Sequence, residues 1–270
     1  MNPVFEIIPE AIFFRETNLI CEISPDGFSY IFENDVEKKF HGLSVFYFSD
    51  GADIAAQLKI IYNEQPLLRK EYKKVFISYS GGESALLPEE LYKPGENERL
   101  LNILYGDLHA GSIAADVVAN KKVYNIYRVS SEIHKTLVEL FPLAVFNHHY
   151  SLLIKQDIPG DLLQVIFYRS TFLAILTKGG LLQIIQEYPY NSGADVVYYM
   201  ENICLQFNLV NISVSAGGML DEGSDLHEEL HHHYPDMVLN ELPADYTYAD
   251  SLKKIPPHYL SHLFSLARCV

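Results

Sequence analysis

The chain contains the same succession of predicted elements twice, and this repeat is the strongest constraint on its fold. Two strand-like runs joined by a turn, a third strand, an amphipathic helix and a strand ending in Gly-Gly occur between residues 19 and 82, and again between residues 162 and 218. Matching positions lie 145 residues apart at the first hairpin (23 and 168), 142 at the helix (53 and 195) and 137 at the last strand (77 and 214). The sequence therefore predicts two similar lobes.

The first copy begins with a predicted antiparallel meander. Residues 19–23 and 28–33 are rich in branched and aromatic side chains, and Pro25-Asp26-Gly27 joins them. Proline fixes φ and glycine tolerates positive φ, so this segment predicts a tight hairpin. A third strand is expected over residues 36–48, with a bulge or bend at Gly42.

The rest of the first copy predicts a helix and a parallel strand. Apolar residues recur at helical spacing between residues 53 and 63, and Asp50 or Asp53 can cap the start of this helix. The short apolar run 75–79 follows the helix, which predicts a buried parallel strand at the centre of the sheet.

The middle of the chain predicts an insertion and the end of the first lobe. Residues 83–118 have a mixed pattern, which we interpret as an insertion with one or two short helices. Residues 123–129 predict a strand, and Ser130 or Ser131 can cap a helix that stops before Pro142. The first lobe is expected to comprise residues 1–120 and the second residues 121–270, with the boundary anywhere between 115 and 160.

The second copy repeats the meander over residues 162–168, 171–176 and 181–187, with a turn at Gly179-Gly180. Asn191 or Ser192 can cap the next helix, which extends to residue 207. After Gly218 the sequence predicts a histidine-containing helix, a strand over residues 237–240 and a C-terminal helix near residues 260–267.

Composition excludes several classes of function. Lys and Arg total 20 against 35 Asp and Glu, and the resulting net charge of −15 disfavours nucleic acid as a partner. Cys21, Cys204 and Cys269 are far apart and odd in number, which argues against a disulfide framework or a cysteine metal site. The chain begins without a signal-peptide pattern and has no apolar run near the roughly 18 residues of a membrane span, so we expect a cytoplasmic protein without membrane insertion.

The order of three antiparallel strands, helix, parallel strand, helix and parallel strand, present twice, resembles the actin-like ATPase fold, also called the ribonuclease H-like fold. The fold class expected is α/β, each half a mixed sheet flanked by helices. Four segments carry a closer resemblance, to an uncharacterised bacterial family of unknown function with this fold: Ser-Pro-Asp-Gly-Phe-Ser (24–29), Leu-Pro-Glu-Glu-Leu-Tyr (87–92), Leu-Tyr-Gly-Asp-Leu-His (104–109) and residues 195–207.

The resemblance implies a nucleotide site with a defined residue pattern. Actin-like proteins hold nucleotide in the cleft between their halves, using an acidic-Gly-Ser/Thr hairpin in each half. The first hairpin here keeps Asp26, Gly27 and Ser29, whereas the second reads Tyr168-Arg-Ser-Thr and has neither acid nor glycine. The second half therefore lacks the groups that hold metal and phosphate in that superfamily.

A Gly-Gly turn near the adenosine completes the superfamily pattern, and Gly217-Gly218 matches it. The candidate nucleotide-binding residues are thus Asp26, Gly27, Ser29, Gly217 and Gly218, and the ligand implied is ATP with magnesium. The sequence assigns no catalytic residue and no metal ligand.

Each candidate also has a purely structural interpretation. Asp26 is a usual residue for a Pro-Asp-Gly turn, and the Gly-Gly pairs can be simple strand exits. His227 and His231 are four residues apart and could offer two ligands on one helical face, but spacing fixes no third. His148 and His149 are adjacent, so their side chains diverge. Four tyrosines near Pro189 fit either a core or an interface: Tyr188, Tyr190, Tyr198 and Tyr199.

Two functional hypotheses follow. In the first, the chain is a binding or scaffold module whose catalytic motifs are degraded, and its ligand is another protein; self-association is compatible with the same surface. In the alternative, it is an ATP-binding or ATP-hydrolysing enzyme that uses Asp26, Ser29 and Gly217-Gly218. Fold alone does not decide between them.

Overall fold

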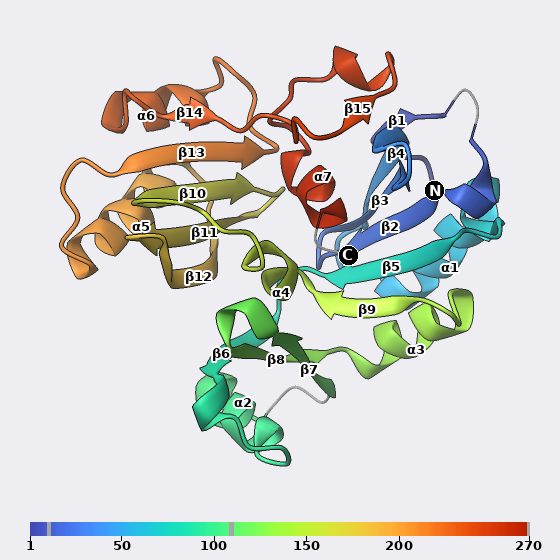
Figure 1. The fold of residues 1–270 in the computed structure, drawn as a ribbon, viewed down its shortest axis with the longest axis horizontal. Coiled ribbons are helices and arrows are strands. Elements are labelled where there is room, and N and C mark those ends of the chain that lie inside the picture. Colours follow the sequence, from blue (N-terminus) through green and yellow to red (C-terminus); the bar gives the residue numbers. More distant parts are fainter. Residues whose placement is uncertain (10–11, 108–110, 269–270) are drawn as a thin grey trace. The chain divides into compact units, whose positions relative to one another are not determined.

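The computed structural model describes residues 1–9, 12–107 and 111–268, and the chain divides into two compact units (Figure 1). Unit 1 comprises residues 1–155, 245–252 and the end of the chain from Leu266, and unit 2 comprises residues 156–244 and 253–265. Leu108 and His109, which end the family-like segment 104–109, and Cys269 lie outside the described residues. The return of two C-terminal segments to unit 1 has no counterpart in the sequence pattern.

Unit 1 is built on a seven-stranded mixed sheet. Its strands are β1 (Phe5–Ile7), β2 (Asn18–Ile23), β3 (Gly27–Asn34), β4 (Lys39–Tyr47), β5 (Lys74–Tyr79), β9 (Val145–His148) and β15 (Thr247–Tyr248). The strand order is β1-β4-β3-β2-β5-β9, and β15 pairs with β4. The antiparallel meander β2-β3-β4 and the parallel strand β5 beside β2 confirm the sequence prediction.

Local sequence signals explain the start of the helix and the bend in this sheet. The Asp53 side chain accepts a hydrogen bond from the Ala56 N–H and caps α1 (Ile54–Glu64), as predicted. In β4, Gly42 lies opposite Phe32 while Phe40 lies opposite Glu33, so the intervening residue is extra. This is the bulge that Gly42 predicts.

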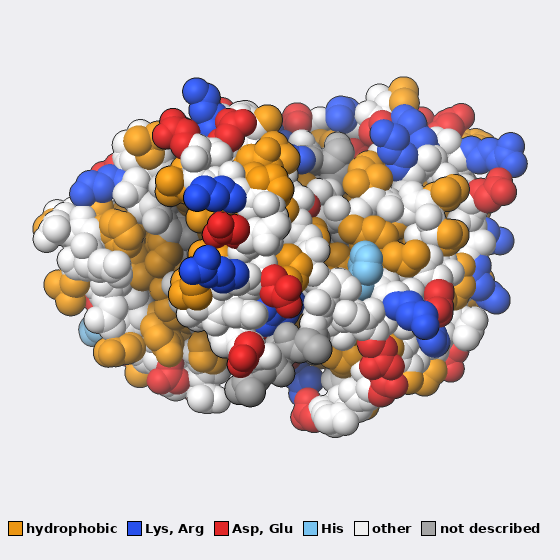
Figure 2. All heavy atoms as spheres, turned by 90° about the horizontal axis from the view of Figure 1, so that it is seen from below, with side chains coloured by type: hydrophobic (Ala, Val, Ile, Leu, Met, Phe, Trp, Pro, Cys, Tyr) orange, Lys and Arg blue, Asp and Glu red, His pale blue; other side chains and the backbone are white. Residues whose placement is uncertain are grey.

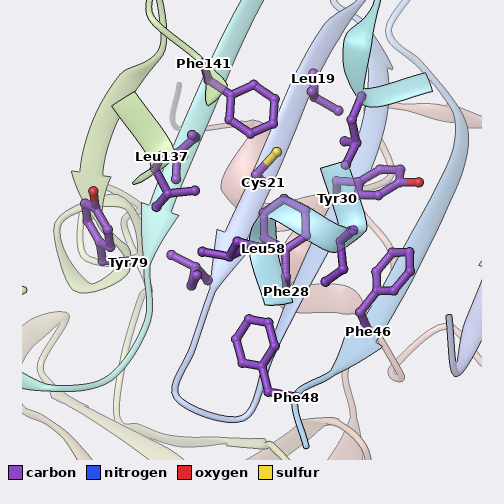
Figure 3. Packing of buried hydrophobic residues seen from close by; sticks show 14 of the residues in the cluster. Leu19, Cys21, Phe28, Tyr30, Phe46, Phe48, Leu58, Tyr79, Leu137 and Phe141 are labelled. Carbon is purple, nitrogen blue, oxygen red and sulfur yellow. The ribbon is translucent and has the colours of Figure 1, made fainter. Parts of the chain in front are cut away.

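The core of unit 1 lies between the sheet and two helices, α1 and α3 (Ser131–Leu140). Ser130 caps α3 by accepting from the Ile133 N–H. Figure 3 shows the packing of the two helices against the meander, in which Leu58 of α1 and Leu137 of α3 are 2% and 0% exposed. The meander contributes mainly large side chains to this cluster: Leu19, Cys21, Phe28, Tyr30 and Phe46.

The insertion differs from the sequence prediction. It contains one helix, α2 (Asn97–Tyr105), but most of it is a three-stranded antiparallel sheet of β6 (Glu83–Pro88), β8 (Val123–Val129) and β7 (Ser112–Val118), with β8 in the middle. The predicted strand 123–129 exists, yet it belongs to this small sheet. The last parallel strand of the main sheet is β9, which follows α3 and precedes the short α4 (His149–Leu153).

Unit 2 repeats the plan of unit 1. Its sheet has the order β12-β11-β10-β13-β14, with strands at Leu162–Phe167 (β10), Thr171–Lys178 (β11), Leu181–Pro189 (β12), Ser213–Gly218 (β13) and Val238–Leu239 (β14). Ser192 and Asp195 form a capping box at the start of α5 (Gly193–Gln206). α5 and α6 (Asp225–His233) contribute to one core cluster with the sheet, and α7 spans Ser261–Ala267.

The two meanders and their following strands correspond in detail, which confirms the duplication. β2 pairs in parallel with β5 as β10 pairs with β13, so Ile23 lies opposite Tyr79 and Phe167 opposite Gly218. No helix in the described part of the chain is long and apolar enough to cross a membrane. On the face drawn in Figure 2, basic side chains are interspersed with acidic and hydrophobic ones.

Candidate functional site

Asp26 and Gly27 lie in the turn between β2 and β3 of unit 1, and Ser24 organises this turn. The backbone N–H groups of Asp26 and Gly27 donate to Ser24 Oγ over 3.3 and 3.1 Å. The Ser24 N–H in turn donates to the Gly27 carbonyl over 2.9 Å. Actin-like hairpins bind phosphate through backbone N–H groups of this kind. In this turn, the N–H groups of Asp26 and Gly27 already have an acceptor, Ser24 Oγ.

Gly27 also has a packing role. A Cβ atom on this residue would lie 2.3 Å from the Phe46 carbonyl oxygen, so glycine is what allows β4 to approach the turn. Ser29 is half-buried within β3, where it lies opposite Val45 of β4. Both residues are thus accounted for by the local sheet.

Gly217 and Gly218 end β13 in unit 2, and both are buried. A Cβ on Gly217 would lie 2.4 Å from Asn240 Nδ2 and 2.7 Å from Ser261 Oγ. Gly218 has a φ of +85°, and a Cβ there would lie 2.2 Å from the Phe167 carbonyl oxygen. Its N–H donates to the His258 carbonyl over 2.8 Å. The chain itself therefore occupies the space around this Gly-Gly turn.

The second hairpin turn is closed by aromatic packing. The Tyr168 N–H donates to the Thr171 carbonyl over 2.8 Å, and the Tyr190 hydroxyl donates to the Tyr168 carbonyl over 3.0 Å. The ring of Tyr190 also meets that of Phe167 edge-on, with 5.8 Å between centroids. This turn, which has no acidic-Gly pair, is tied to the end of β12 instead.

The predicted nucleotide residues thus form two separate sets. Asp26, Gly27 and Ser29 share one hairpin of unit 1, while Gly217 and Gly218 share one strand end of unit 2. Their assignment to nucleotide stays a prediction, and each set has a structural role within its own unit.

His148 has a role that sequence reasoning missed. It is 1% exposed, and its Nε2–H donates to the Gly81 carbonyl over 3.1 Å. Its Nδ1 accepts from the Tyr150 N–H over 3.2 Å, and its backbone N–H donates to Asp116 Oδ2 over 2.7 Å. His148 therefore joins the Gly-Gly turn after β5 to the start of α4. Burial, and secondarily the neighbouring His149, lower the pKa of His148 to about 3.

This buried imidazole predicts a pH dependence of stability. The ordinary pKa of histidine is 6.5, and that of His148 in the folded chain is about 3. Between these two pH values His148 is protonated in the unfolded chain and neutral in the folded chain. The free energy of unfolding therefore falls as the pH falls through this window. One such site contributes at most about 1.4 kcal/mol per pH unit. The slope of unfolding free energy between pH 6 and 4 should therefore be shallower in His148→Gln, by about 1 kcal/mol per unit. Urea unfolding at several pH values measures it, and parallel slopes would contradict the prediction.

The histidines of α6 make contacts within their own helix and the turn before it. His227 and His231 stack with 6.1 Å between ring centroids, and His227 Nδ1 accepts from the Gly223 N–H over 3.3 Å. Among the described residues, no group of three or more His, Cys, Asp or Glu side chains could hold a metal ion. The two cysteines that the structure describes, Cys21 and Cys204, are free and buried, and burial raises the pKa of each thiol.

The tyrosines near Pro189 divide between core and surface. Tyr188 and Tyr199 pack with 4.6 Å between ring centroids, and both lie against Phe172. Tyr198, whose ring meets that of Tyr199 edge-on with 5.6 Å between centroids, is 65% exposed. Most of this cluster therefore belongs to the core of unit 2.

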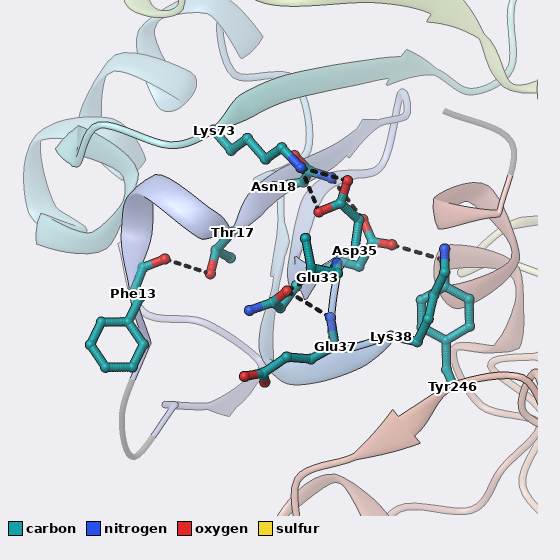
Figure 4. Close-up of polar contacts among 11 residues, drawn as sticks. Phe13, Thr17, Asn18, Glu33, Asp35, Glu37, Lys38, Lys73 and Tyr246 are labelled. Atoms are coloured by element: carbon teal, nitrogen blue, oxygen red, sulfur yellow. Dashed lines mark hydrogen bonds and ion pairs between the residues drawn. The ribbon is translucent and has the colours of Figure 1, made fainter.

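A buried carboxylate in unit 1 is the other feature that sequence reasoning missed (Figure 4). Glu33 is 1% exposed; its Oε1 accepts from the Tyr246 hydroxyl over 2.8 Å and its Oε2 from Asn18 Nδ2 over 3.0 Å. Lys38 Nζ also donates to the Tyr246 hydroxyl, over 3.3 Å. The only sequence signal is an acidic residue at the end of the apolar run 28–32. This hydrogen-bond network connects the segment 245–252 to β3.

Comparison with known proteins places the chain in a family. A family profile described as "Protein of unknown function (DUF3822)" matches residues 14–237. No curated protein matches the chain. A Bacteroides thetaiotaomicron protein, solved as having an actin-like ATPase fold and unknown function, is similar to it with a TM-score of 0.79 and 18% identity, over 96% of this chain and 100% of that one.

A second solved structure, the PilM–PilN type IV pilus biogenesis complex, is similar with a TM-score of 0.62 and 12% identity, over 95% of this chain and 99% of the other. At these identities the likeness concerns the fold. The family match, by contrast, spans most of the sequence. The chain therefore belongs to the family described as "Protein of unknown function (DUF3822)", and its fold is that of the actin-like ATPases.

Proposed function

We propose that this protein is a cytoplasmic binding module that recognises another protein and does not hydrolyse ATP. The proposal rests on one observation. In the turns of this chain that correspond to the nucleotide-binding turns of actin-like ATPases, backbone groups and glycines already contact other groups of the same unit. Ser24 Oγ accepts from the backbone donors of the first turn. Gly217 and Gly218 pack against side chains and backbone of their own unit.

The class of ligand is inferred from the fold and the charge. A chain of the PilM–PilN type IV pilus biogenesis complex has a similar fold, so the fold is compatible with recognition of a protein. The net charge of −15 disfavours nucleic acid. A protein partner is the ligand class that meets both conditions.

The competing function is ATP binding or hydrolysis through Asp26, Ser29 and Gly217-Gly218. It is favoured by the partial Asp-Gly-x-Ser match in the first hairpin alone. An ATPase of this fold also needs an acid and phosphate-binding backbone in the second half, where the turn is Tyr168-Arg-Ser-Thr.

Thermal unfolding with and without ATP and magnesium distinguishes the two functions. A ligand that binds only the folded state and is present at about 100 times its Kd adds about 2.7 kcal/mol, or roughly 5–10 °C in Tm for a chain of this size. We expect no shift in Tm and no phosphate release. A shift of several degrees that Asp26→Ala abolishes would instead establish a nucleotide-binding protein.

A further inference from the structure

Unit 1 has a groove in which the basic side chains of this acidic protein are concentrated. Its volume is about 840 Å³, and segments 68–75 and 140–145 form most of its wall. One acidic residue, Glu71, lines it together with five basic ones: Arg15, Arg69, Lys70, Lys73 and Lys74. A quarter of the 20 Lys and Arg residues of the chain thus line one groove, although the chain as a whole carries a charge of −15.

Three of these cations are available for an external anion. Arg15 pairs with Glu71 over 3.0 Å, and Lys73 pairs with Asp35 over 2.8 Å. Arg69, Lys70 and Lys74 are exposed and form no ion pair with any described residue; the ammonium groups of Lys70 and Lys74 lie over the rings of Phe14 and Phe76, at 5.8 and 5.9 Å from their centroids. Their charge is therefore not neutralised within the described part of the chain.

The same groove offers apolar surface. Leu143 is 91% exposed and Val145 47% exposed, next to the buried Phe141 in the groove wall. Apolar side chains of a ligand can therefore pack beside the three cations.

We propose that this groove binds an acidic segment of a partner protein that also carries branched aliphatic residues. Its aliphatic side chains cover Leu143 and Val145, and its carboxylates meet Arg69, Lys70 and Lys74. The inference rests on the proposed partner-binding function and specifies where the partner binds and what chemistry it has. A concave wall favours a peptide over a flat anionic membrane surface.

The test uses the full chain and a short fluorescein-labelled peptide that combines Asp or Glu with Leu or Val. Fluorescence anisotropy is expected to show saturable binding that weakens with added salt. The double variant Lys70→Glu/Lys74→Glu should weaken binding at least about tenfold, because it reverses two charges at the groove rim. A peptide with the acids replaced by their amides should bind more weakly as well.

The matched control is Lys93→Glu/Lys135→Glu. These two lysines are exposed, lie in unit 1 outside the groove lining, and their exchange changes the net charge by the same amount. The control should bind the peptide within about twofold of the unmodified chain, since charges beyond a Debye length are screened.

Three results would overturn the proposal. The first is no saturable binding of the peptide, and the second is equal weakening in both double variants, which indicates a general charge effect. The third is a different occupant that needs Lys70 and Lys74: co-sedimentation with phosphatidylserine vesicles, or self-association in sedimentation velocity. A shift in Tm with ATP and magnesium bears on the proposed function alone, so the two failures are distinguishable.

Discussion

Replacement of Gly218 by Ala is expected to lower the free energy of unfolding by about 4 kcal/mol, or roughly 10 °C in Tm. Two costs add at this position. The φ of +85° is disfavoured for a residue with a Cβ, and the new Cβ would lie 2.2 Å from the Phe167 carbonyl oxygen and 2.6 Å from its nitrogen. Because these are backbone atoms of the paired strand β10, relief of the clash would require the strand pair to separate.

Gly160→Ala is the matched control for this prediction. Gly160 is in the same unit and has a φ of +77°, but nothing lies within 4 Å of a Cβ placed there. The free energy of unfolding of the Gly160→Ala variant should fall by only about 1 kcal/mol, the conformational cost of a positive φ in a residue with a Cβ. Chemical unfolding of both variants measures the difference, and equal losses would mean that close packing at Gly218 contributes nothing to stability.

Replacement of Glu33 by Ala should have the second large effect, a loss of about 3 kcal/mol. The Tyr246 hydroxyl and Asn18 Nδ2 both donate to this carboxylate, and each would be left buried without its acceptor, at a cost of about 1–3 kcal/mol per group. Glu37→Ala is the control. Glu37 lies four residues further on, in the turn after β3, and its side chain is exposed, so its loss should change stability by less than about 0.5 kcal/mol.

A double-mutant cycle then identifies the interaction. Tyr246→Phe alone removes one hydrogen bond to a charged group and should cost about 2 kcal/mol. Combined with Glu33→Ala it should cost clearly less than the sum of the two single effects, because the shared hydrogen bond can be lost only once. The same variants should increase proteolysis in the segment 245–252. Additive effects would show that Glu33 and Tyr246 contribute independently.

The sequence predicts the repeated core well because its signals are local. The cap at Asp53, the capping box at Ser192 and the bulge at Gly42 each depend on a few neighbouring residues. The same holds for the runs of branched and aromatic side chains in the two meanders. Local patterns of this kind are retained in the folded chain when they agree with its topology.

The insertion shows where local signals fail. Residues 83–88 and 112–118 are mostly half-buried, so they carry neither a continuous apolar run nor a regular alternation. These two strands form by pairing with β8. β8 begins at residue 123, 40 residues after the start of β6 at residue 83. Stabilisation by cross-strand pairs depends on the partner strand and is invisible within either segment.

The sequence by itself determined a duplicated α/β chain of actin-like order, a net charge of −15 and two glycine turns that resemble nucleotide-binding loops. Only the tertiary structure shows which groups those turns contact. Glu33 meets Tyr246 across 213 positions of sequence, and Gly218 meets His258 across a long connection. Whether a buried carboxylate or a backbone N–H is free for a ligand depends on which distant group satisfies it, because a buried polar group left unpaired is costly and is normally paired in the folded chain. Periodicity and spacing contain no information about such long-range partners, so these contacts had to come from the fold.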